Sequence, residues 1–264
     1  VMASLDIAER RLPQDGRLRV AVRGHEIDLR IATSPTIHGE SVVMRILDRS
    51  NLSLDFKTLG FEDDVLEQFL HVLKQPHGIV LVTGPTGSGK TTTLYASLAA
   101  INSPDRKILT IEDPIEYRLG GINQTQVKPQ IGLTFAAALR SFLRQDPDVM
   151  MVGEIRDLET AEVAIQSALT GHTILSTLHT NSAAASVTRL IDMRVEPFLI
   201  TSTLNAVLAQ RLVRRLCPKC REAYAPTQAF LQGILPGTDT SGVKQLYRPK
   251  GCDACGHTGF RGRL

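Results

Sequence analysis

A short apolar run, followed by a glycine-rich loop and a helical pattern, constrains this chain more than any other feature. The stretch runs from Ile79 to Thr93 as IVLVTGPTGSGKTTT. Ile79 to Val82 form an apolar run typical of a strand buried on both faces, and a helical pattern follows Lys90. Buried strands of this kind belong to parallel sheets covered by helices. The sequence therefore predicts an α/β fold.

The loop has the G-x-x-x-x-G-K-T spacing of a phosphate-binding loop. Its glycines allow a tight turn that points successive N–H groups at phosphate oxygens, with the positive end of the next helix behind them. Lys90 is expected to reach the β and γ phosphates of ATP, and the Thr91 hydroxyl to bind Mg²⁺. A flexible turn is the alternative, but the strand, the spacing, the lysine and the hydroxyl agree on a nucleotide site. The candidate nucleotide-binding residues are Gly84, Pro85, Thr86, Gly87, Ser88, Gly89, Lys90, Thr91 and Thr92.

Composition sets wider bounds. A chain of 264 residues with 42% hydrophobic and 22% charged residues has room for two modest domains of ordinary globular character. No apolar run approaches the roughly 20 residues that cross a bilayer, and the start has no signal-peptide layout, so we expect a cytosolic site of action. Residues 211–264 hold 10 Lys and Arg against 3 Asp and Glu. That excess leaves nucleic acid or an anionic membrane surface open as partners.

Residues 1–56 are predicted to form a small α/β domain. Leu18, Val20 and Val22 alternate with polar residues, a turn follows, and Ile27 resumes the alternation, so a hairpin is expected. A third strand is expected from 41 to 47, after a break at 33–35. Residues 57–61 are predicted to be a linker and 62–264 a larger domain, beginning with a helix over 62–74.

Three further strand ends carry functional types of side chain. The strand over 107–111 ends in Glu112, Asp113 and Glu116, the strand over 149–152 ends in Glu154, and the strand over 173–178 ends at His179. Ligands bind beyond the carboxyl ends of parallel strands, so these groups are expected to meet the nucleotide. We expect Glu116 to position or activate the attacking water, Glu154 to organise Mg²⁺, and His179 to sense the γ phosphate. The alternatives are an acidic turn before Pro114 and an ordinary loop histidine.

The remaining helices are predicted from periodicity. One covers 134–144, with Arg140 and Arg144 on one face, and another begins at its cap Asp157 and runs to Leu169. A long amphipathic helix is expected over about 198–216.

The C-terminal segment contains two C-x-x-C pairs. Cys217 and Cys220 form the first, Cys252 and Cys255 the second. In a chain expected to be cytosolic, paired C-x-x-C units favour a Zn²⁺ site over disulfides, and four thiolates leave no open position, so the role would be structural. Such a site carries a net −2 charge and offsets part of the basic excess, which weakens the nucleic-acid interpretation.

At this point the residues resemble a known family, the type II secretion and type IV pilus assembly ATPases. GPTGSGKTTTLY, ILTIEDPIEY, MMVGEIRD and LTGHTILSTLHTN are similar to that family's Walker A motif, Asp box, Walker B motif and His box, in the same order and spacing. The stretch TRLIDMRVEPFLI is closer to the secretion branch, the GspE family. One departure is Glu154 at the Walker B position, where many such enzymes have Asp, so Mg²⁺ would be held through water.

The resemblance implies a RecA-like P-loop ATPase domain, a smaller PAS-like α/β domain before it (the second N-terminal domain) and a tetracysteine subdomain over 217–255. It implies a hexameric ATPase at the inner face of the inner membrane, using ATP and Mg²⁺ to drive pseudopilus assembly. It also implies peripheral membrane association only, through a platform protein that binds a further N-terminal domain. We expect no nucleic-acid partner. Arg30 and Arg45 match arginines that the family directs at nucleotide across the domain interface. Taken alone, each is equally well read as a surface arginine or part of an ion pair.

Two other functions remain open from the residues. A nucleic-acid translocase is permitted by the basic segment, although 5% aromatic content without Trp offers few stacking platforms. A nucleotide-gated scaffold that barely hydrolyses ATP would carry the same loop.

Overall fold

The computed structural model describes residues 2–22, 25–48 and 54–264. Its internal contacts divide the chain into two units. The first comprises Val1–Asp55 together with Glu116–Arg118, and the second comprises Phe56–Ile115 and Leu119–Leu264.

The first unit is built on a three-stranded antiparallel sheet in the order β1-β2-β3. Its strands are β1 (Gln14–Val22), β2 (His25–Thr36) and β3 (Gly39–Asp48). The predicted hairpin is confirmed, and residues 23 and 24 of its turn lie outside the described residues. The break expected at 33–35 is wrong, because β2 continues to Thr36 and Pro35 pairs with Glu40. Proline's fixed φ suits extended backbone, and its missing donor matters least near a strand end.

Arginines form a row across this sheet. Arg17, Arg30 and Arg45 stand directly opposite one another on β1, β2 and β3. Residues directly opposite in antiparallel strands project from the same face, so the three side chains share one side of the sheet. Like charges in this arrangement repel one another, and an anionic partner on that face relieves the repulsion.

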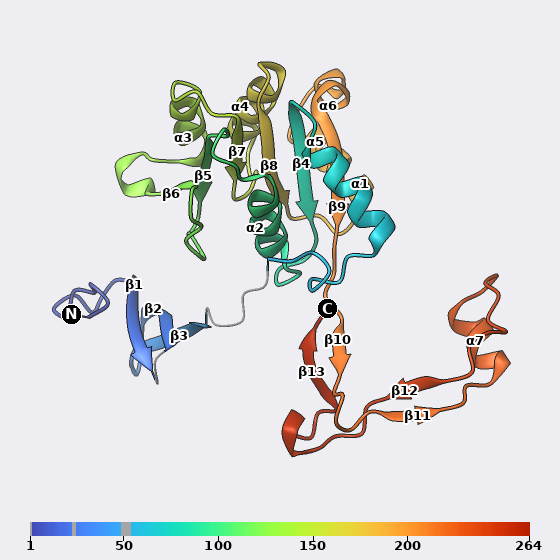
Figure 1. Ribbon diagram of the computed structural model, residues 1–264. Coiled ribbons are helices and arrows are strands. Elements are labelled where there is room, and N and C mark those ends of the chain that lie inside the picture. Colours follow the sequence, from blue (N-terminus) through green and yellow to red (C-terminus); the bar gives the residue numbers. More distant parts are fainter. Residues whose placement is uncertain (1, 23–24, 49–53) are drawn as a thin grey trace. The chain divides into compact units, whose positions relative to one another are not determined.

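The second unit contains a six-stranded sheet in the order β6-β5-β7-β8-β4-β9, with every neighbouring pair parallel. Figure 1 shows its strands side by side with helices around them. The strands are β4 (Gly78–Thr83), β5 (Ile108–Glu112), β6 (Asn123–Gln126), β7 (Val149–Val152), β8 (Thr173–Leu178) and β9 (Leu204–Ala209). The helices are α1 (Asp63–Leu73), α2 (Lys90–Ile101), α3 (Phe135–Phe142), α4 (Leu158–Leu169), α5 (Ala183–Asp192) and α6 (Pro197–Thr203).

Both faces of this sheet are buried. Ile79 and Leu81 of β4 belong to a core cluster that includes residues of α3 and α4, whereas Val80 and Val82 point to the other face and are 0% exposed. Helix α2 contacts β4 and β8 on its side of the sheet. The α/β fold class is therefore confirmed. Asp157 also caps α4 as predicted, because its side chain accepts a hydrogen bond from Thr160 N at 2.8 Å.

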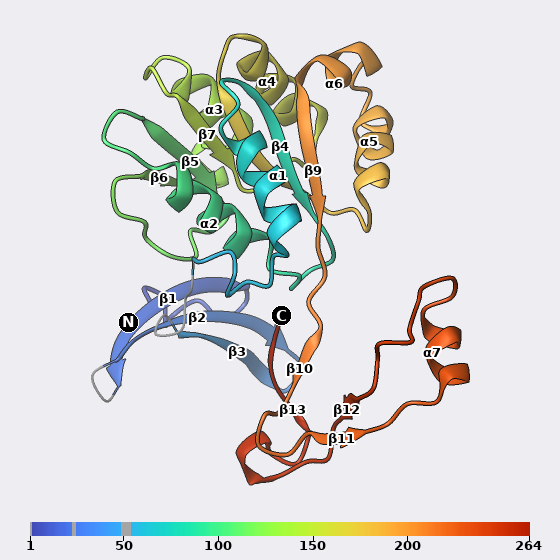
Figure 2. The same cartoon turned by 45° about the vertical axis from the view of Figure 1, so that its right-hand side comes forward.

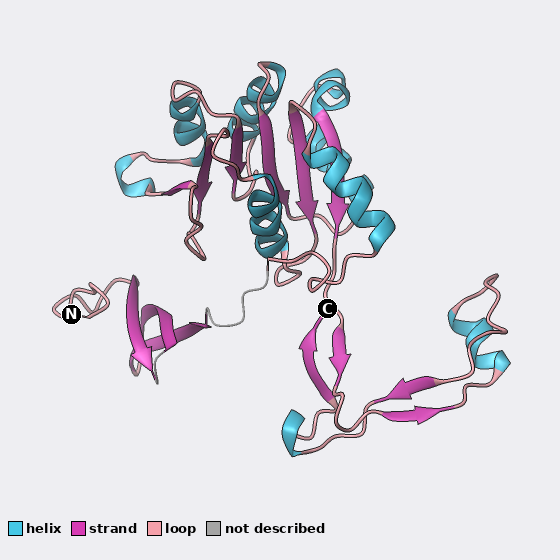
Figure 3. Ribbon diagram, viewed as in Figure 1, coloured by secondary structure: helices cyan, strands magenta, loops and turns pink. Residues whose placement is uncertain are grey.

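The long helix predicted over 198–216 is wrong. Helix α6 ends at Thr203, and the next residues form β9, which adds to the edge of the sheet parallel to β4. Figure 3 shows this change from helix to strand. Leu204, Val207 and Leu208 fit helical spacing, but the unpaired edge of β4 offers a backbone ladder that the sequence pattern does not reveal.

Beyond β9 the chain leaves the sheet as an arm, defined here as residues 214–264. Its elements are β10 (Arg214–Leu216), β11 (Glu222–Tyr224), α7 (Gln228–Ile234), β12 (Leu246–Arg248), η2 (Asp253–Cys255) and β13 (Phe260–Arg263). Two separate two-stranded antiparallel ladders, β10-β13 and β11-β12, run along it (Figure 2). At the base of the arm, Val213 and Leu264 exchange two backbone hydrogen bonds of 2.8 and 2.9 Å.

Candidate nucleotide site and metal centre

The predicted site residues of the second unit gather at one edge of the six-stranded sheet. Because its strands are parallel, their carboxyl ends lie along the same edge. There β4 leads into Gly84, β5 ends at Glu112, β7 leads through Gly153 to Glu154, and β8 leads to His179.

The loop after β4 adopts a conformation that needs its glycines. Gly84, Gly87 and Gly89 have φ values of 145°, 79° and 88°, in the region that residues with a side chain rarely adopt. Gly89 is the N-cap of α2, so the free N–H groups of the helix's first turn border the loop. The Ser88 hydroxyl oxygen is buried without a hydrogen-bond partner within the described part of the chain. This set of donors fits the oxygens of a nucleoside polyphosphate.

Lys90 closes over this loop. Its ammonium donates hydrogen bonds to the carbonyl oxygens of Gly84 at 2.9 Å and Pro85 at 3.2 Å. Burial of the amine lowers the pKa of Lys90 below its ordinary value, and the Glu154 carboxylate partly opposes that shift. The Lys90 ammonium therefore donates to neutral backbone carbonyl oxygens. Negatively charged phosphate oxygens would be stronger hydrogen-bond acceptors for it.

Glu154 forms the acidic side of the site. Its side chain is 12% exposed, accepts a hydrogen bond from Arg156, and lies 3.0 Å from His179 Nε2 through Oε2. Burial tends to raise the pKa of Glu154, but the hydrogen bond and charge of Arg156, followed by His179, outweigh it and hold the pKa below its ordinary value. Glu154 therefore stays ionised and available to a cation. Arg156 is a partner that the sequence reasoning missed.

A hydroxyl network joins the strand before the phosphate-binding loop to the segment after His179. Thr180 N donates to Thr83 Oγ1 at 3.1 Å, and the Thr180 hydroxyl lies 2.5 Å from that of Ser186 on α5. Thr83 and Ser186 are both 0% exposed. The loops that follow β4 and β8 are therefore fixed relative to each other.

Glu112 is held in a way that removes it from solvent. It is 3% exposed and accepts hydrogen bonds from Tyr95 on α2, from Thr110 Oγ1 at 2.6 Å and from Gln124 Nε2 at 3.0 Å. These three donors and the burial keep the Glu112 carboxylate away from solvent and from any attacking water. Glu112 instead ties α2, β5 and β6 together.

Glu116 falls in the first unit, within Glu116–Arg118. There its carboxylate accepts a hydrogen bond from Arg30 Nη2, and the two side chains are 29% and 18% exposed. Two residues predicted to act on the nucleotide thus pair with each other. The structure brings Glu154, His179 and Lys90 together at the sheet edge, and it groups Glu116 with Arg30.

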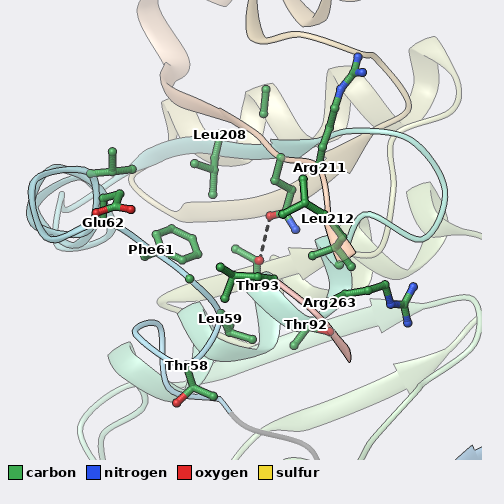
Figure 4. A pocket seen from close by; sticks show the side chains of 17 residues that line it. Thr58, Leu59, Phe61, Glu62, Thr92, Thr93, Leu208, Arg211, Leu212 and Arg263 are labelled. Carbon is green, nitrogen blue, oxygen red and sulfur yellow. Dashed lines mark hydrogen bonds between the residues drawn. The ribbon is translucent and has the colours of Figure 1, made fainter. Parts of the chain in front are cut away.

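A pocket of about 500 Å³ opens beside the start of α2 (Figure 4). Gly89, Thr92 and Thr93 form the wall next to the loop. The other walls come from the segment before α1 and the first turn of that helix, from the end of β9 and the residues after it, and from the last two residues of the arm. Those lining residues are Thr58, Leu59, Gly60, Phe61, Glu62, Val65, Leu208, Ala209, Gln210, Arg211, Leu212, Val213, Arg263 and Leu264.

The predicted linker residues take part in this pocket. Phe56 and Phe61 pack edge to face, with ring centroids 5.1 Å apart, and both contact Phe69 of α1 at 5.9 and 5.7 Å. This aromatic trio holds 56–61 against α1. The two phenylalanines in an otherwise polar stretch were the signal that could have revealed it.

The four cysteines of the arm converge. Their sulfur atoms all lie within 4.8 Å of one another, with Cys217–Cys252 at 4.0 Å and Cys220–Cys255 at 3.8 Å. Tetrahedral Zn²⁺ with bonds of about 2.3 Å separates its sulfur ligands by about 3.8 Å, so the residues fit this ion. Burial opposes ionisation of Cys255, but backbone N–H groups of Cys252 and Gly259 outweigh it and lower the pKa of that thiol to about 6.

Comparison with known families matches residues 1–264, the whole chain, to the family described as type II/IV secretion system protein. The chain belongs to this family. The membership confirms the resemblance carried by the four ordered motifs.

Curated relatives in the family carry both secretion and pilus names. The chain is 60% identical over 264 residues to the type II secretion system protein E of Xanthomonas campestris, covering 100% of the chain and 46% of the relative. It is 56% identical to the type II secretion system ATPase E of Vibrio cholerae, covering 100% and 52%. It is also 55% identical to the type IV pilus assembly ATPase PilB of Myxococcus xanthus, covering 100% and 47%. The chain spans about half the length of these relatives.

Solved structures with this fold include a pilus retraction motor with bound ADP. The pilus retraction motor PilT with bound ADP has a TM-score of 0.67 and 36% identity, covering 79% of this chain and 61% of that one. The ATPase DotB of Legionella pneumophila has a TM-score of 0.62 and 28% identity, covering 76% and 58%. Across 2–22, 25–48 and 54–264, no helix has the length and apolar character needed to span a membrane.

Proposed function

We propose that this chain is the catalytic part of a secretion ATPase, which hydrolyses ATP to ADP and phosphate at the carboxyl edge of the six-stranded sheet. The observation that carries this proposal is the pairing of a glycine loop and Lys90 after β4 with the ionised Glu154 after β7. Names of relatives at 56% and 55% identity include ATPase, which supports the same chemistry.

The loop 84–89 and the N-terminal turn of α2 bind the phosphates. Lys90 exchanges its contacts with the Gly84 and Pro85 carbonyls for phosphate oxygens, where its charge counters the negative charge of phosphoryl transfer. Thr91 and Glu154 would hold Mg²⁺, which neutralises charge on the β and γ phosphates. Glu154 acts through water, since its carboxylate already accepts from Arg156.

Glu116 and His179 have the remaining roles at the γ phosphate. Glu116 positions or activates the attacking water, and releasing its partner Arg30 frees both side chains for the nucleotide. His179, which is 53% exposed beside Glu154, senses the γ phosphate. Glu112 is the next candidate for the role of Glu116, and it is less favoured because it is 3% exposed and its oxygens already accept from three donors.

The pocket beside α2 takes the base and ribose. It adjoins Gly89 and Thr92 at the phosphate-binding loop, and Leu59, Phe61 and Leu212 give it apolar walls suited to a flat ring. Arg211 and Arg263 at its margin suit the ribose and α phosphate.

Arg30 and Arg45 supply positive charge in the transition state. Their place in a row of three arginines on one face of the small sheet supports a role towards an anion. We expect Arg30→Ala and Arg45→Ala to fold and to bind ADP nearly as the parent does, but to lose most hydrolysis. A parallel loss of ADP affinity, or unchanged hydrolysis, would count against this role. Arg19→Ala, which removes an ion pair with Asp28 on the same sheet, is the matched control.

The tetracysteine cluster binds one structural Zn²⁺. Four thiolates at tetrahedral separations support this role, and they leave no coordination position for substrate.

At the level of the whole protein, we propose a homo-oligomeric motor, a hexamer, that acts in the cytoplasm at the inner face of the inner membrane and drives pseudopilus assembly for type II secretion. It would reach the membrane peripherally, through a platform protein bound by a domain outside this chain. Type IV pilus assembly is the second candidate, because a pilus assembly ATPase is 55% identical. A nucleic-acid translocase is less favoured, because Arg214 and Arg221 stack on Phe260 and Tyr247 and Glu222 pairs with Arg248 and Lys250.

The test is phosphate release from Mg-ATP by the zinc-loaded chain, measured with its mass over a range of protein concentrations. We expect binding of ATP, and hydrolysis that rises with oligomer formation. Glu116→Gln should keep ATP binding and lose hydrolysis. Absence of Mg-ATP binding by the parent chain would overturn the proposal, and DNA-stimulated hydrolysis would favour the translocase.

A further inference from the structure

Gln210 forms hydrogen bonds to the phosphate-binding loop and to helix α2. It is the first residue after β9, and its side-chain Nε2 donates to Ser88 O at 2.5 Å. Its Oε1 accepts from the Thr93 hydroxyl at 2.8 Å, which is the dashed line in Figure 4. One amide therefore contacts the residue just before the N-cap of α2 and the first turn of that helix.

The backbone of Gln210 also contacts the loop. Its N–H donates to Thr83 O at 2.9 Å, which extends the β4-β9 ladder by one step. A Cβ atom at Gly84 would lie 2.3 Å from Gln210 O, so the two backbones touch where the loop begins. This close approach, together with a φ of 145°, explains why position 84 requires glycine.

The two residues that the Gln210 side chain contacts lie on either side of Lys90 in the sequence. Ser88 precedes it by two residues and Thr93 follows it by three, and both are buried, at 3% exposed. A phosphate-binding loop binds more tightly when its N–H groups already point at the ligand, since ordering them on binding would weaken affinity. Gln210 links the two segments on either side of the lysine, which limits how far the loop can open away from α2.

We propose that Gln210 is a positioning residue, which holds the loop 84–89 and the first turn of α2 in the arrangement that binds phosphate. This inference rests on the proposed nucleotide site. Gln210 acts on the ligand through Ser88 and Thr93 rather than by touching the reacting atoms. Since Gln210 also lines the pocket beside α2, its action through the loop has to be separated from any contact with the base.

The experiment compares Gln210→Met with the parent for two ligands, Mg-ADP and inorganic tripolyphosphate. Methionine keeps the length of the side chain and removes both hydrogen bonds. Loss of two hydrogen bonds that order the loop is expected to weaken both ligands by about tenfold. Tripolyphosphate contacts the loop but lacks a base, so an equal loss for both ligands identifies the loop as the route.

Asn205→Leu is the matched control. Asn205 lies on β9, the strand that precedes Gln210, and donates from its side-chain amide to His77 O at 2.7 Å, at the end of β9 away from the loop. Its loss should lower the melting temperature without changing either affinity. Thr93→Val removes the hydrogen bond to Gln210 Oε1. We expect the affinity for both ligands to fall by about threefold from the loss of this one hydrogen bond.

The outcomes distinguish a failure of the proposed nucleotide site from a failure of the proposed role of Gln210. A parent chain that binds neither ligand overturns the proposed function itself. If the parent binds both ligands, and Gln210→Met and Thr93→Val bind them as tightly as the parent does, only the positioning role of Gln210 is overturned. Weaker Mg-ADP with unchanged tripolyphosphate also overturns it, because Gln210 would then act on the base. If Gln210→Met fails to melt cooperatively, Thr93→Val decides the question.

Discussion

The carboxyl edge of the six-stranded sheet and the tetracysteine arm both gather candidate functional side chains, but these side chains are held in opposite ways. At the edge, the side chains come from segments that directly follow strands whose residues are buried throughout, such as β4 and β8. In the arm, the ladders β10-β13 and β11-β12 are short, and only Cys217 of the four cysteines is buried.

This difference indicates what stabilises each of the two sites. The core of the second unit sets the positions of Lys90, Glu154 and His179 before any ligand binds. The arm has little apolar core between its ladders, so we expect its fold to depend on the Zn²⁺ proposed at the four sulfurs. Perturbing one region should therefore leave the other largely intact.

The largest expected effect is at the edge, with Lys90→Ala. The variant should lower ATP hydrolysis by about 100-fold or more, because a buried cation that counters phosphate charge is lost. Zinc content and the protection of the arm from proteolysis should stay unchanged. Lys74→Ala, at an exposed C-cap of α1, is the control. Hydrolysis by Lys90→Ala within about twofold of the parent would contradict the assignment of the loop.

Cys252→Ser tests the arm. One ligand is lost, so we expect zinc content to fall from one ion per chain towards zero and the arm to become sensitive to protease. Mg-ADP affinity should change by less than about fivefold, because only the base of the arm reaches the pocket. Metal analysis and limited proteolysis measure this. Full protection of a zinc-free arm would show that its ladders are sufficient by themselves.

Glu154→Gln tests the charge cluster through pH. The folded pKa of Glu154 is lowered, so its ion pairs stabilise the fold above the unfolded pKa of about 4.3, and this contribution is lost as pH falls through the lower folded value. Since Arg156 and His179 are more than half exposed, the contribution is about 1 kcal/mol at most. The variant should melt a few degrees lower at pH 7, and the gap should close below about pH 4. A gap that persists unchanged at pH 3 would contradict this.

The smallest effect is expected where the two regions meet. Leu212→Ala trims an apolar wall of the pocket between β9 and the arm, and should weaken Mg-ADP by about threefold to fivefold while leaving tripolyphosphate unchanged. Val187→Ala, on the exposed face of α5, is the control. Equal weakening of both ligands would show that Leu212 acts on the loop and not on the base.

The two regions also differ in how much the sequence could predict. The phosphate-binding loop, Glu154 and His179 follow buried strands of strong apolar pattern, so motif and secondary structure agreed there. The four cysteines could be recognised as a candidate metal site from their C-x-x-C spacing alone. Gln210 and the strand before it were missed, because Leu204 to Ala209 fit a helix as well as a strand and only the free edge of β4 decides between them. The pairing of Arg30 with Glu116 joins residues 86 positions apart, and no local pattern encodes it.

The most direct test of the account is hydrogen exchange of the zinc-loaded chain, measured peptide by peptide with and without Mg-ADP. We predict that nucleotide slows exchange in 84–93, in the pocket segments 58–62 and 208–213, and around Glu154 and His179, while 217–255 stays unchanged. Slowed exchange in 217–255 with no change in 84–93 would contradict the central claim that the carboxyl edge of the sheet is the nucleotide site.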